Sequence, residues 1–461
     1  MLKKGHLIEV DIAAMAFGGR GIAKHDGMTL FVDGGVEGDR ARIRITRKKK
    51  RYAEAVMETL LVPSVQRVSA PCRYAGYCGG CKWQGIAYRR QLDYKKQHVL
   101  ESLEHIGKLA DIRVHDTLPS PAVFAYRNKM EFSCTDRRWR LPHEMDQPPT
   151  DDGAAVGLHV PGTFYKVLDI ENCLLQPEAG NAILEDVRAF MRRSDLPVYD
   201  LRRHTGFWRF VVLRHSSARD EWMVNIVTGF EQQNALAPLC SKLLQRHADI
   251  VSIVNNVTTR KAAVAVGEHE TLLSGRAMIR DRIGPFAFNI SANSFFQTNT
   301  AAAEILYGVV KDYADLNGGE TVLDLYSGTG SIAVFLSPAA HDIVGIEQVP
   351  SAVQDAETNC RLNHIHNCRF IQGDIRRCLQ GIAVRPSVVI SDPPRAGMHP
   401  DVIAQIMHLA PGRIVYVSCN PASLARDVAL LQPAYTLKKV QPVDMFPHTP
   451  HIEAVALLER G

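Results

Sequence analysis

The 461-residue chain lacks any run of about 18 consecutive apolar residues, although 46% of its residues are hydrophobic. Its basic start, with Lys3 and Lys4, is not followed by the apolar segment of a secretion signal. We therefore expect a folded, soluble protein of the cytoplasm. Internal repeats and low-complexity segments are also missing, and the length suffices for two or three domains. Because no feature indicates a protein partner, we expect a monomer.

Complete phosphate-binding glycine motifs are missing as well. The apolar strand Val322–Leu325 leads into a turn with only two glycines, Gly328 and Gly330. The longer motif of nucleoside triphosphate sites is absent, and so is the third glycine of the dinucleotide fingerprint. Glu347 ends the next apolar strand, where a carboxylate can accept both hydroxyl groups of a ribose. This pairing fits the adenosine part of S-adenosylmethionine, and a dinucleotide is the alternative.

Ten cysteines are present in a chain that we expect in a reducing compartment, where disulfides are rare. Their spacing is therefore more informative than their number. Cys72, Cys78 and Cys81 follow one another closely, and Cys173 is distant in the chain. Four thiolates can bind either zinc or an iron–sulfur cluster. Apart from Cys419, the remaining cysteines show no comparable spacing, and we assign them no role: Cys134, Cys240, Cys360, Cys368 and Cys378.

The first 62 residues contain short apolar segments separated by glycine turns. Five such segments are typical of a small barrel of the OB type, which often binds oligonucleotides. The expected strands are Leu7–Ile12, Gly18–Ala23, Leu30–Val32, Asp39–Thr46 and Tyr52–Leu61. Eight Arg and Lys residues fall between Arg40 and Arg51, interleaved with Ile43 and Ile45. Such a strand pair can face a polyanion; the alternative is a strand edge protected by solvated charges.

The periodicity of the remaining chain predicts an α/β fold in three parts, 1–62, 63–285 and 286–461. A helix is expected over Tyr88–Ile106, and strands prevail from 126 to 266, with helices at Asn181–Arg193 and Glu231–Arg246 and a loop at Leu141–Ala154. From Phe288 onward strands alternate with helices, as in a parallel sheet whose ligands bind at the carboxyl strand ends. The strand cores are Thr321–Leu325, Ile343–Glu347, Val388–Ser391 and Ile414–Ser418.

Two polar residues follow strands of this sheet directly. Asp392 precedes Pro393 and Pro394, which cannot continue a hydrogen-bonded ladder, so a stiff turn holds its carboxylate at the sheet edge. The alternative role for Asp392 is to cap a helix. Cys419 lies between Ser418 and a helix that begins near Pro421, and a helix N-terminus stabilises a thiolate.

A carboxylate gives Cys419 a chemical partner. Glu453 follows a proline-held loop and begins an apolar strand over Ala454–Leu458. C5 of uracil is too weak a nucleophile to attack a sulfonium methyl group, but thiolate addition at C6 activates it, and a base must then remove the C5 proton. Cytosine-C5 chemistry commonly uses a thiolate preceded by proline, whereas Ser418 precedes Cys419.

These motifs together resemble the RNA uridine-C5 methyltransferases that act on tRNA or on large-subunit rRNA. The resemblance covers nearly the whole chain and rests on five motifs in order: Ser294–Asn299, Asp324–Gly330, Asp392–Arg395, Ser418–Pro421 and His448–Glu453. It implies a C-terminal, Rossmann-like class I methyltransferase domain. It also implies that Gln297, Tyr326, Glu347 and Asp392 line the S-adenosylmethionine and uracil site, with Cys419 as nucleophile and Glu453 as base.

The N-terminal barrel resembles the TRAM domain of the rRNA-directed members. That resemblance implies 23S rRNA as the substrate, with the T-loop uridine of tRNA as the alternative. The cysteine pattern resembles the [4Fe–4S] ligands of the same members, which implies a central α+β iron–sulfur domain that uses Cys72, Cys78, Cys81 and Cys173. A hypothesis of another class is an RNA-binding or RNA-folding factor with a vestigial catalytic site.

Overall fold

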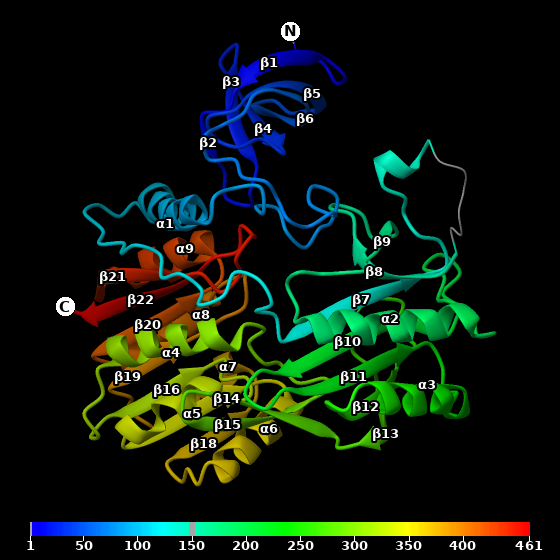
Figure 1. Cartoon of the computed structure of the whole chain (residues 1–461). Helices are drawn as coiled ribbons and strands as arrows, with labels where there is room; N and C mark the ends of the chain where they lie inside the picture. The colour runs from blue at the N-terminus through cyan, green and yellow to red at the C-terminus, as the bar shows by residue number, and fades with distance from the viewer. Residues whose placement is uncertain (1, 147–152, 263) are drawn as a thin grey trace. The chain divides into compact units, whose positions relative to one another are not determined.

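Figure 1 shows the computed structural model, which describes residues 2–146, 153–262 and 264–461. By its internal contacts the chain divides into two units, each assembled from segments that are distant in the sequence. The first unit combines Met1–Ser120, Pro394–Met398 and Val417–Leu458; the second combines Pro121–Pro393, His399–Tyr416 and Glu459–Gly461. The three-part division predicted from the sequence is a different partition, and it stays a prediction.

Six strands at the N-terminus form one sheet in the order β1-β5-β6-β4-β3-β2. They are β1 (Leu7–Asp11), β2 (Ala14–Met15), β3 (Gly21–His25), β4 (Met28–Asp33), β5 (Arg40–Lys48) and β6 (Tyr52–Val62). Along β5, Ala41, Ile43 and Ile45 are buried and the arginines between them are exposed, which is the two-residue period of a half-buried strand. The five predicted strands are confirmed, and the short β2 is an addition.

Helix α1 (Tyr88–His105) follows in the first unit and confirms the predicted helix. It packs against α9 (Pro421–Leu431) and β21 (Tyr435–Val443), and β22 (Glu453–Arg460) follows in the chain. Three polar residues at helical spacing, Gln91, Lys95 and His98, lie on its buried face. Because buried polar groups need partners, this face positions neighbouring loops as well as filling the core.

The second unit contains a seven-stranded sheet in the order β13-β12-β11-β10-β7-β8-β9, covered by two helices. The strands are β7 (Lys129–Thr135), β8 (Ala155–His159), β9 (Val167–Asp169), β10 (Trp208–Ser216), β11 (Glu221–Thr228), β12 (Ile250–Val257) and β13 (His269–Gly275), and the helices are α2 (Glu178–Arg193) and α3 (Gln233–Arg246). A hairpin of β14 (Met278–Ile283) and β15 (Phe286–Ser291) follows. The predicted strand-rich region and its two helices are confirmed.

A parallel sheet in the same unit has the strand order β18-β17-β16-β19-β20. Its elements are α4 (Thr300–Ala314), β16 (Thr321–Leu325), α5 (Ser331–Leu336), β17 (Asp342–Glu347), α6 (Pro350–Leu362), β18 (Cys368–Gln372), α7 (Ile375–Gln380), β19 (Val388–Ser391), α8 (Pro400–Leu409) and β20 (Arg413–Ser418). All four predicted strand cores are confirmed. The order of the strands reverses between β16 and β19, and ligands of open α/β sheets bind at such a switch point.

The described part of the chain also contains two short 3-10 helices, η1 (Pro142–Glu144) and η2 (Ser337–Ala339). The predicted loop Leu141–Ala154 contains η1, and its residues 147–152 lie outside the described residues. No helix of the described chain is both long enough and apolar enough to cross a membrane.

Candidate active site

The glycine turn after β16 has the backbone conformation that its glycines permit. Gly328 and Gly330 have φ angles of 54° and 72°, and Tyr326 has a φ of 62°. A Cβ atom on Gly330 would lie 2.8 Å from Phe370 Cζ and 2.9 Å from Ala356 Cβ, both closer than van der Waals contact. Glycine is therefore required where the turn enters α5.

Glu347, the last residue of β17, is hydrogen-bonded to this turn. Its Oε2 accepts from the Gly328 N–H at 3.0 Å, and its Oε1 accepts from the Val349 N–H at 2.8 Å. Each carboxylate oxygen can accept more than one hydrogen bond. Glu347 is thus oriented by the backbone and still has acceptor capacity for the two hydroxyl groups of a ribose.

Asp324 within β16 is a buried carboxyl group that the sequence analysis did not single out. It is 1% exposed, and neither of its oxygens has a hydrogen-bond partner among the described residues. The buried hydroxyl groups of Ser327 and Ser391 also have no partner there. Burial, followed by repulsion from Asp392 and Glu347, raises the pKa of Asp324 well above its usual range. Buried polar groups normally have partners, so this edge fits a polar, cationic ligand such as the methionine part of S-adenosylmethionine.

Asp392 lies at the adjacent strand end. Its N–H donates to the Leu325 carbonyl oxygen at 3.4 Å, which places Asp392 beside the end of β16. Burial raises the pKa of Asp392 to about 7. Near neutral pH this carboxyl group can therefore either donate or accept a hydrogen bond, which suits contact with the polar edge of a base.

Tyr307 on α4 connects Gln297 to the glycine turn. Its buried hydroxyl group pairs with Ser331 Oγ at 2.7 Å and also hydrogen-bonds to the side chain of Gln297. Burial raises the pKa of Tyr307, so the phenol stays neutral. The backbone carbonyl of Gln297 accepts from Asn128 Nδ2 at 2.8 Å. Both the main chain and the side chain of Gln297 are therefore held in place.

The four residues predicted for the cofactor site, Gln297, Tyr326, Glu347 and Asp392, all belong to the second unit. Sequence reasoning missed Asp324 and Tyr307. A single acid inside an otherwise apolar strand was a usable signal for Asp324. Tyr307 carried no such signal, because an aromatic residue on a mostly apolar helix is ordinary core composition.

Cys419 and Glu453 belong to the first unit. Cys419 directly precedes Asn420, which caps α9 by accepting from the Ala422 N–H at 3.1 Å. Asn420 Nδ2 donates to the Arg395 carbonyl oxygen at 2.9 Å, which fixes the cap. The partial positive charge at the start of α9 favours an anion, so this position favours the thiolate form of Cys419.

A pocket of about 330 Å³ opens onto Cys419. Its polar lining includes three side chains with basic groups, Lys82, Arg395 and His451, and its apolar lining includes Phe17 from the N-terminal barrel. Lys82 Nζ donates to the Gly18 carbonyl oxygen at 3.2 Å, which links the cysteine-rich loop to the barrel. The pocket therefore places the Cys419 thiol beside an aromatic side chain and basic groups, a combination that suits a nucleotide.

The loop before Glu453 is held by the cysteine-rich loop and by α1. The backbone N–H groups of Lys82 and Trp83 donate to the His448 carbonyl oxygen at 3.0 and 2.9 Å. The His448 N–H donates to Gln91 Oε1 at 2.8 Å. Because burial lowers the pKa of His448 to about 4, its ring is neutral at physiological pH. These contacts fix the backbone between Phe446 and Glu453 from two sides.

Glu453 begins β22 and does not line the Cys419 pocket, whereas His451, two residues earlier, does. A fully buried ion pair lies next to this loop: Lys95 Nζ donates to Asp444 Oδ1 at 2.5 Å and to the Phe446 carbonyl oxygen at 3.1 Å. Burial lowers the pKa of Lys95, and attraction to Asp444 and Glu453 opposes that effect. The charge of Lys95 thus acts on the predicted base as well as on its own partner.

The four predicted metal ligands are divided between the two units. Cys72, Cys78 and Cys81 lie on one loop of the first unit, and Cys173 belongs to the second unit. Over residues 2–146, 153–262 and 264–461, no group of three or more His, Cys, Asp or Glu side chains could hold a metal ion. Spacing along a chain limits which cysteines can meet, but it does not fix their side-chain geometry. The structure therefore does not support the predicted cluster.

The basic run of the barrel divides into two groups. Arg40, Arg42 and Arg44 of β5 form ion pairs with Glu9 and Glu58. Residues 47–51 are exposed, and none of them pairs with a carboxylate in the described part of the chain. Because β5 lies between β1 and β6, the alternative of a protected sheet edge is wrong. The turn after β5 is the better candidate for contacts with phosphate groups.

Comparisons with known proteins extend over nearly the whole chain. Residues 231–461 match the family model described as tRNA (uracil-5-)-methyltransferase, and residues 2–57 match the TRAM domain. An RNA methyltransferase of Chlorobaculum tepidum is 42% identical over 471 residues, covering 100% of this chain and 97% of the relative. The chain belongs to the tRNA (uracil-5-)-methyltransferase family. The predicted resemblance, the TRAM barrel and the methyltransferase assignment are thereby confirmed.

Two further proteins place this RNA methyltransferase among its relatives. An RNA methyltransferase of Porphyromonas gingivalis is 40% identical, covering 98% of this chain and 100% of the relative. The crystal structure of the Pyrococcus abyssi tRNA (uracil-54, C5)-methyltransferase with S-adenosyl-L-homocysteine has a TM-score of 0.75 and 29% identity, and it covers 98% of this chain and 100% of that chain. The predicted class I methyltransferase fold is therefore confirmed.

Proposed function

We propose that this protein methylates C5 of a uridine in 23S rRNA, with S-adenosylmethionine as the methyl donor and Cys419 as a covalent nucleophile. The observation that carries the proposal is the position of Cys419, which directly precedes the capped N-terminus of α9 and lines a pocket with Arg395 and His451. Family membership supports RNA as the substrate and uracil C5 as the reacting atom.

The proposed reaction uses two side chains. Cys419 Sγ adds to C6 of the uracil, so that electron density reaches C5 and C5 forms a bond to the methyl group. The Glu453 carboxylate then takes the C5 proton, and the bond between Sγ and C6 breaks to return the thiolate. Atoms balance because the ring gains a methyl group and loses one proton, while the bond between the methyl group and the donor's sulfonium sulfur breaks and the donor would leave as neutral S-adenosylhomocysteine.

S-adenosylmethionine supplies an electrophilic methyl group when it is bound. Glu347 would accept from its ribose hydroxyl groups, and the partnerless carboxyl group of Asp324 would attract its cationic methionine part. The S-adenosyl-L-homocysteine bound in the Pyrococcus abyssi relative supports this assignment. Gln297, Tyr326 and Asp392 complete the proposed cofactor and uracil site.

The T-loop uridine of tRNA is a second candidate substrate. The Pyrococcus abyssi protein is a tRNA (uracil-54, C5)-methyltransferase, and its match covers 98% of this chain, which includes most of the N-terminal barrel. The barrel is therefore compatible with either RNA. We keep 23S rRNA as the first candidate because the cysteine pattern resembles that of the rRNA-directed members.

Tritium release decides between these substrates. Naked 23S rRNA and a tRNA pool, each labelled at uridine C5, are incubated with S-adenosylmethionine and with wild-type protein or Cys419→Ala. We expect release from 23S rRNA alone and a loss of roughly 10⁴-fold or more in the variant. Release from tRNA alone would replace the rRNA assignment, and release from neither RNA would favour the non-catalytic RNA-binding factor.

The covalent step has its own test. In RNA with 5-fluorouridine, C5 carries no proton for Glu453 to remove, so the adduct cannot resolve and a denaturation-resistant protein–RNA complex should accumulate. Cys419→Ala should form no such complex. Glu453→Gln should form it even with ordinary uridine, because the nucleophile is intact and the base is missing. An undiminished complex in Cys419→Ala would rule out Cys419 as the nucleophile.

The remaining predictions also become proposals. We propose that Cys72, Cys78, Cys81 and Cys173 bind a [4Fe–4S] cluster, on the strength of spacing and resemblance, and we route no catalytic step through it. Iron and zinc analysis of anaerobically purified protein tests this: zinc alone supports the zinc alternative, and neither metal rejects both. We further propose a cytoplasmic monomer with domain boundaries near residues 62 and 285, which limited proteolysis and sedimentation can check.

A further inference from the structure

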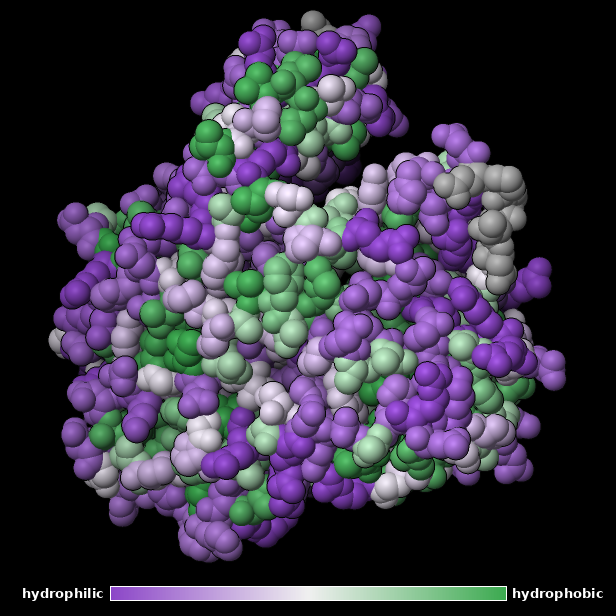
Figure 2. Space-filling view, in the orientation of Figure 1, coloured by the Kyte–Doolittle hydropathy of each residue, from purple (hydrophilic) through white to green (hydrophobic). Residues whose placement is uncertain are grey.

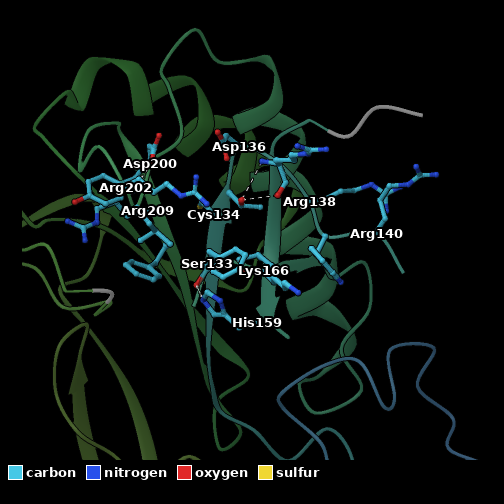
Figure 3. A pocket seen from close by; sticks show the side chains of 18 of the residues that line it. Ser133, Cys134, Asp136, Arg138, Arg140, His159, Lys166, Asp200, Arg202 and Arg209 are labelled. Atoms are coloured by element: carbon cyan, nitrogen blue, oxygen red, sulfur yellow. Dashed lines mark hydrogen bonds between the residues drawn. The ribbon is translucent and has the colours of Figure 1, made fainter. Parts of the chain in front are cut away.

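The central sheet of the second unit carries a pocket that shares no residue with the proposed cofactor site. It has a volume of about 480 Å³, within the usual range for ligand pockets. Strands β7, β9 and β10 and the segments around Arg138 and Leu201 line it. Figure 3 shows Arg202 and Arg209 on one side of this pocket and Arg138 and Arg140 on the other. On the face seen in Figure 2, the surface over β8 and β9 is mainly hydrophilic.

Positive charge dominates the pocket. Six of its lining residues are Arg or Lys and two are Asp: Arg137, Arg138, Arg140, Lys166, Arg202, Arg209, Asp136 and Asp200. Arg138 is paired with Glu144 at 2.9 Å, and Asp200 accepts hydrogen bonds from the backbone N–H groups of Arg202 and Arg203. In the described part of the chain, Lys166 and Arg202 form no ion pair with a carboxylate. The excess charge is therefore available to an anionic ligand.

Arg209 makes this a built site rather than a patch of surface charge. It is only 3% exposed, and its guanidinium group donates to the Thr258 and Ala262 carbonyl oxygens at 2.8 and 3.1 Å. Its Nε atom has no hydrogen-bond partner among the described residues. Its Cζ lies 4.0 Å from the centre of the Tyr199 ring, which also lines the pocket. A buried guanidinium group with an unused N–H donor attracts a phosphate group strongly.

Aromatic side chains stand beside these cations. Lys166 Nζ lies 3.9 Å from the centre of the Trp139 ring, and Tyr165 lines the same pocket. Trp139 is 36% exposed and Tyr165 is 50% exposed, although large aromatic side chains are usually buried. Exposed aromatic rings alternating with Arg and Lys are the pattern of proteins that stack unpaired bases and hold the phosphate groups between them.

We propose that this pocket binds an unpaired segment of the RNA substrate, with a base stacked on Trp139 or Tyr165 and its phosphate held by Lys166, Arg202 and Arg209. The proposal rests on the proposed function only in taking RNA as the ligand. It adds a second contact, made by the central sheet, that would help select the RNA. Duplex RNA should bind poorly there, because its bases are already stacked.

Binding and crosslinking test the proposal without any need for methyl transfer. Short single-stranded RNA with 4-thiouridine is crosslinked to the full-length protein, and the crosslinked peptides are identified. Affinity for the same RNA is measured for the wild type, Trp139→Ala, and the neighbouring but non-lining Phe164→Ala as control. We expect crosslinks within 133–140 or 165–167 and a loss of affinity of about tenfold in Trp139→Ala alone, the order expected for one stacked base.

A second matched pair tests the charges. Arg202→Glu should weaken single-stranded RNA binding and make it less salt-dependent, whereas Arg203→Glu, an equal charge change at a residue outside the lining, should have the smaller effect. The proposal would be overturned if the two variants of each pair bound single-stranded RNA equally well. It would also be overturned if duplex RNA bound as tightly as single-stranded RNA. Binding of free nucleotides as tight as that of RNA would instead indicate a small-molecule site. If wild-type protein methylates no RNA, the proposed function fails while these binding data still decide the pocket.

Discussion

Lys95 on α1 and Asp444 in the loop before β22 form an ion pair from which water is excluded, with 2.5 Å between Nζ and Oδ1. Both side chains are 0% exposed. Removing one partner of such a pair leaves a buried charge without compensation, which typically costs about 3–5 kcal/mol. The pair thus makes the position of the loop before Glu453 depend on a helix that is some 350 residues away in sequence.

Lys95→Met and Asp444→Asn should each lower the free energy of unfolding by about 3–5 kcal/mol. The double variant Lys95→Met/Asp444→Asn should lose much less than the sum, because no unpaired charge remains. Urea unfolding of the four proteins measures this coupling. Additive losses would show that the two groups act independently.

Glu347→Ala should weaken the binding of S-adenosylhomocysteine by at least about tenfold, because the side chain both orients the glycine turn and provides the proposed ribose acceptors. Isothermal titration gives the affinity directly. Glu357→Ala, an exposed change on α6, is the control and should leave it unaltered. RNA affinity should be the same in both variants.

The raised pKa of Asp392 predicts a particular pH dependence of stability. Because the folded protein holds this proton up to about pH 7 and the unfolded chain releases it near pH 4, the folded state binds the extra proton between these values. Stability should therefore fall as pH rises through this window, by up to about 1.4 kcal/mol per pH unit. Asp392→Asn should remove the contribution of this carboxyl group to the pH dependence of the free energy of unfolding, which urea unfolding at several pH values measures. An identical slope in the variant would contradict the assignment.

Lys48→Glu with Lys50→Glu should weaken RNA binding and reduce its salt dependence, because both lysines belong to the exposed run without carboxylate partners. Affinity for S-adenosylhomocysteine should not change. The control is Arg42→Glu with Glu9→Arg, which keeps the net charge and reverses an existing ion pair. Unchanged RNA affinity in the lysine variant would exclude the turn as a phosphate contact.

The sequence predicted most of the elements because strand and helix periods are local. The parallel strands, the glycine turn at Gly328 and Gly330, and the thiol at the start of α9 all followed from short patterns. Contacts between residues that are far apart in the sequence could not be predicted from such patterns. Nothing in the pattern of α1 indicated that Lys95 would meet Asp444, or that Gln91 would hold His448. Asp324 began one of the quoted motifs but received no role of its own, because it lies in an apolar strand. The ligand set of four cysteines stays a prediction, because spacing along the chain does not fix side-chain geometry.

The two hydrogen bonds from Lys82 and Trp83 to the His448 carbonyl oxygen join a loop that contains Cys78 and Cys81 to the segment that lines the pocket at Cys419. Hydrogen bonds between main-chain atoms hold the two segments together whichever side chains are present. A change in the position of that loop would therefore alter the pocket at Cys419 without altering any strand of the parallel sheet. The geometry of the pocket at Cys419 thus depends on a cysteine-rich loop that lies outside the parallel sheet.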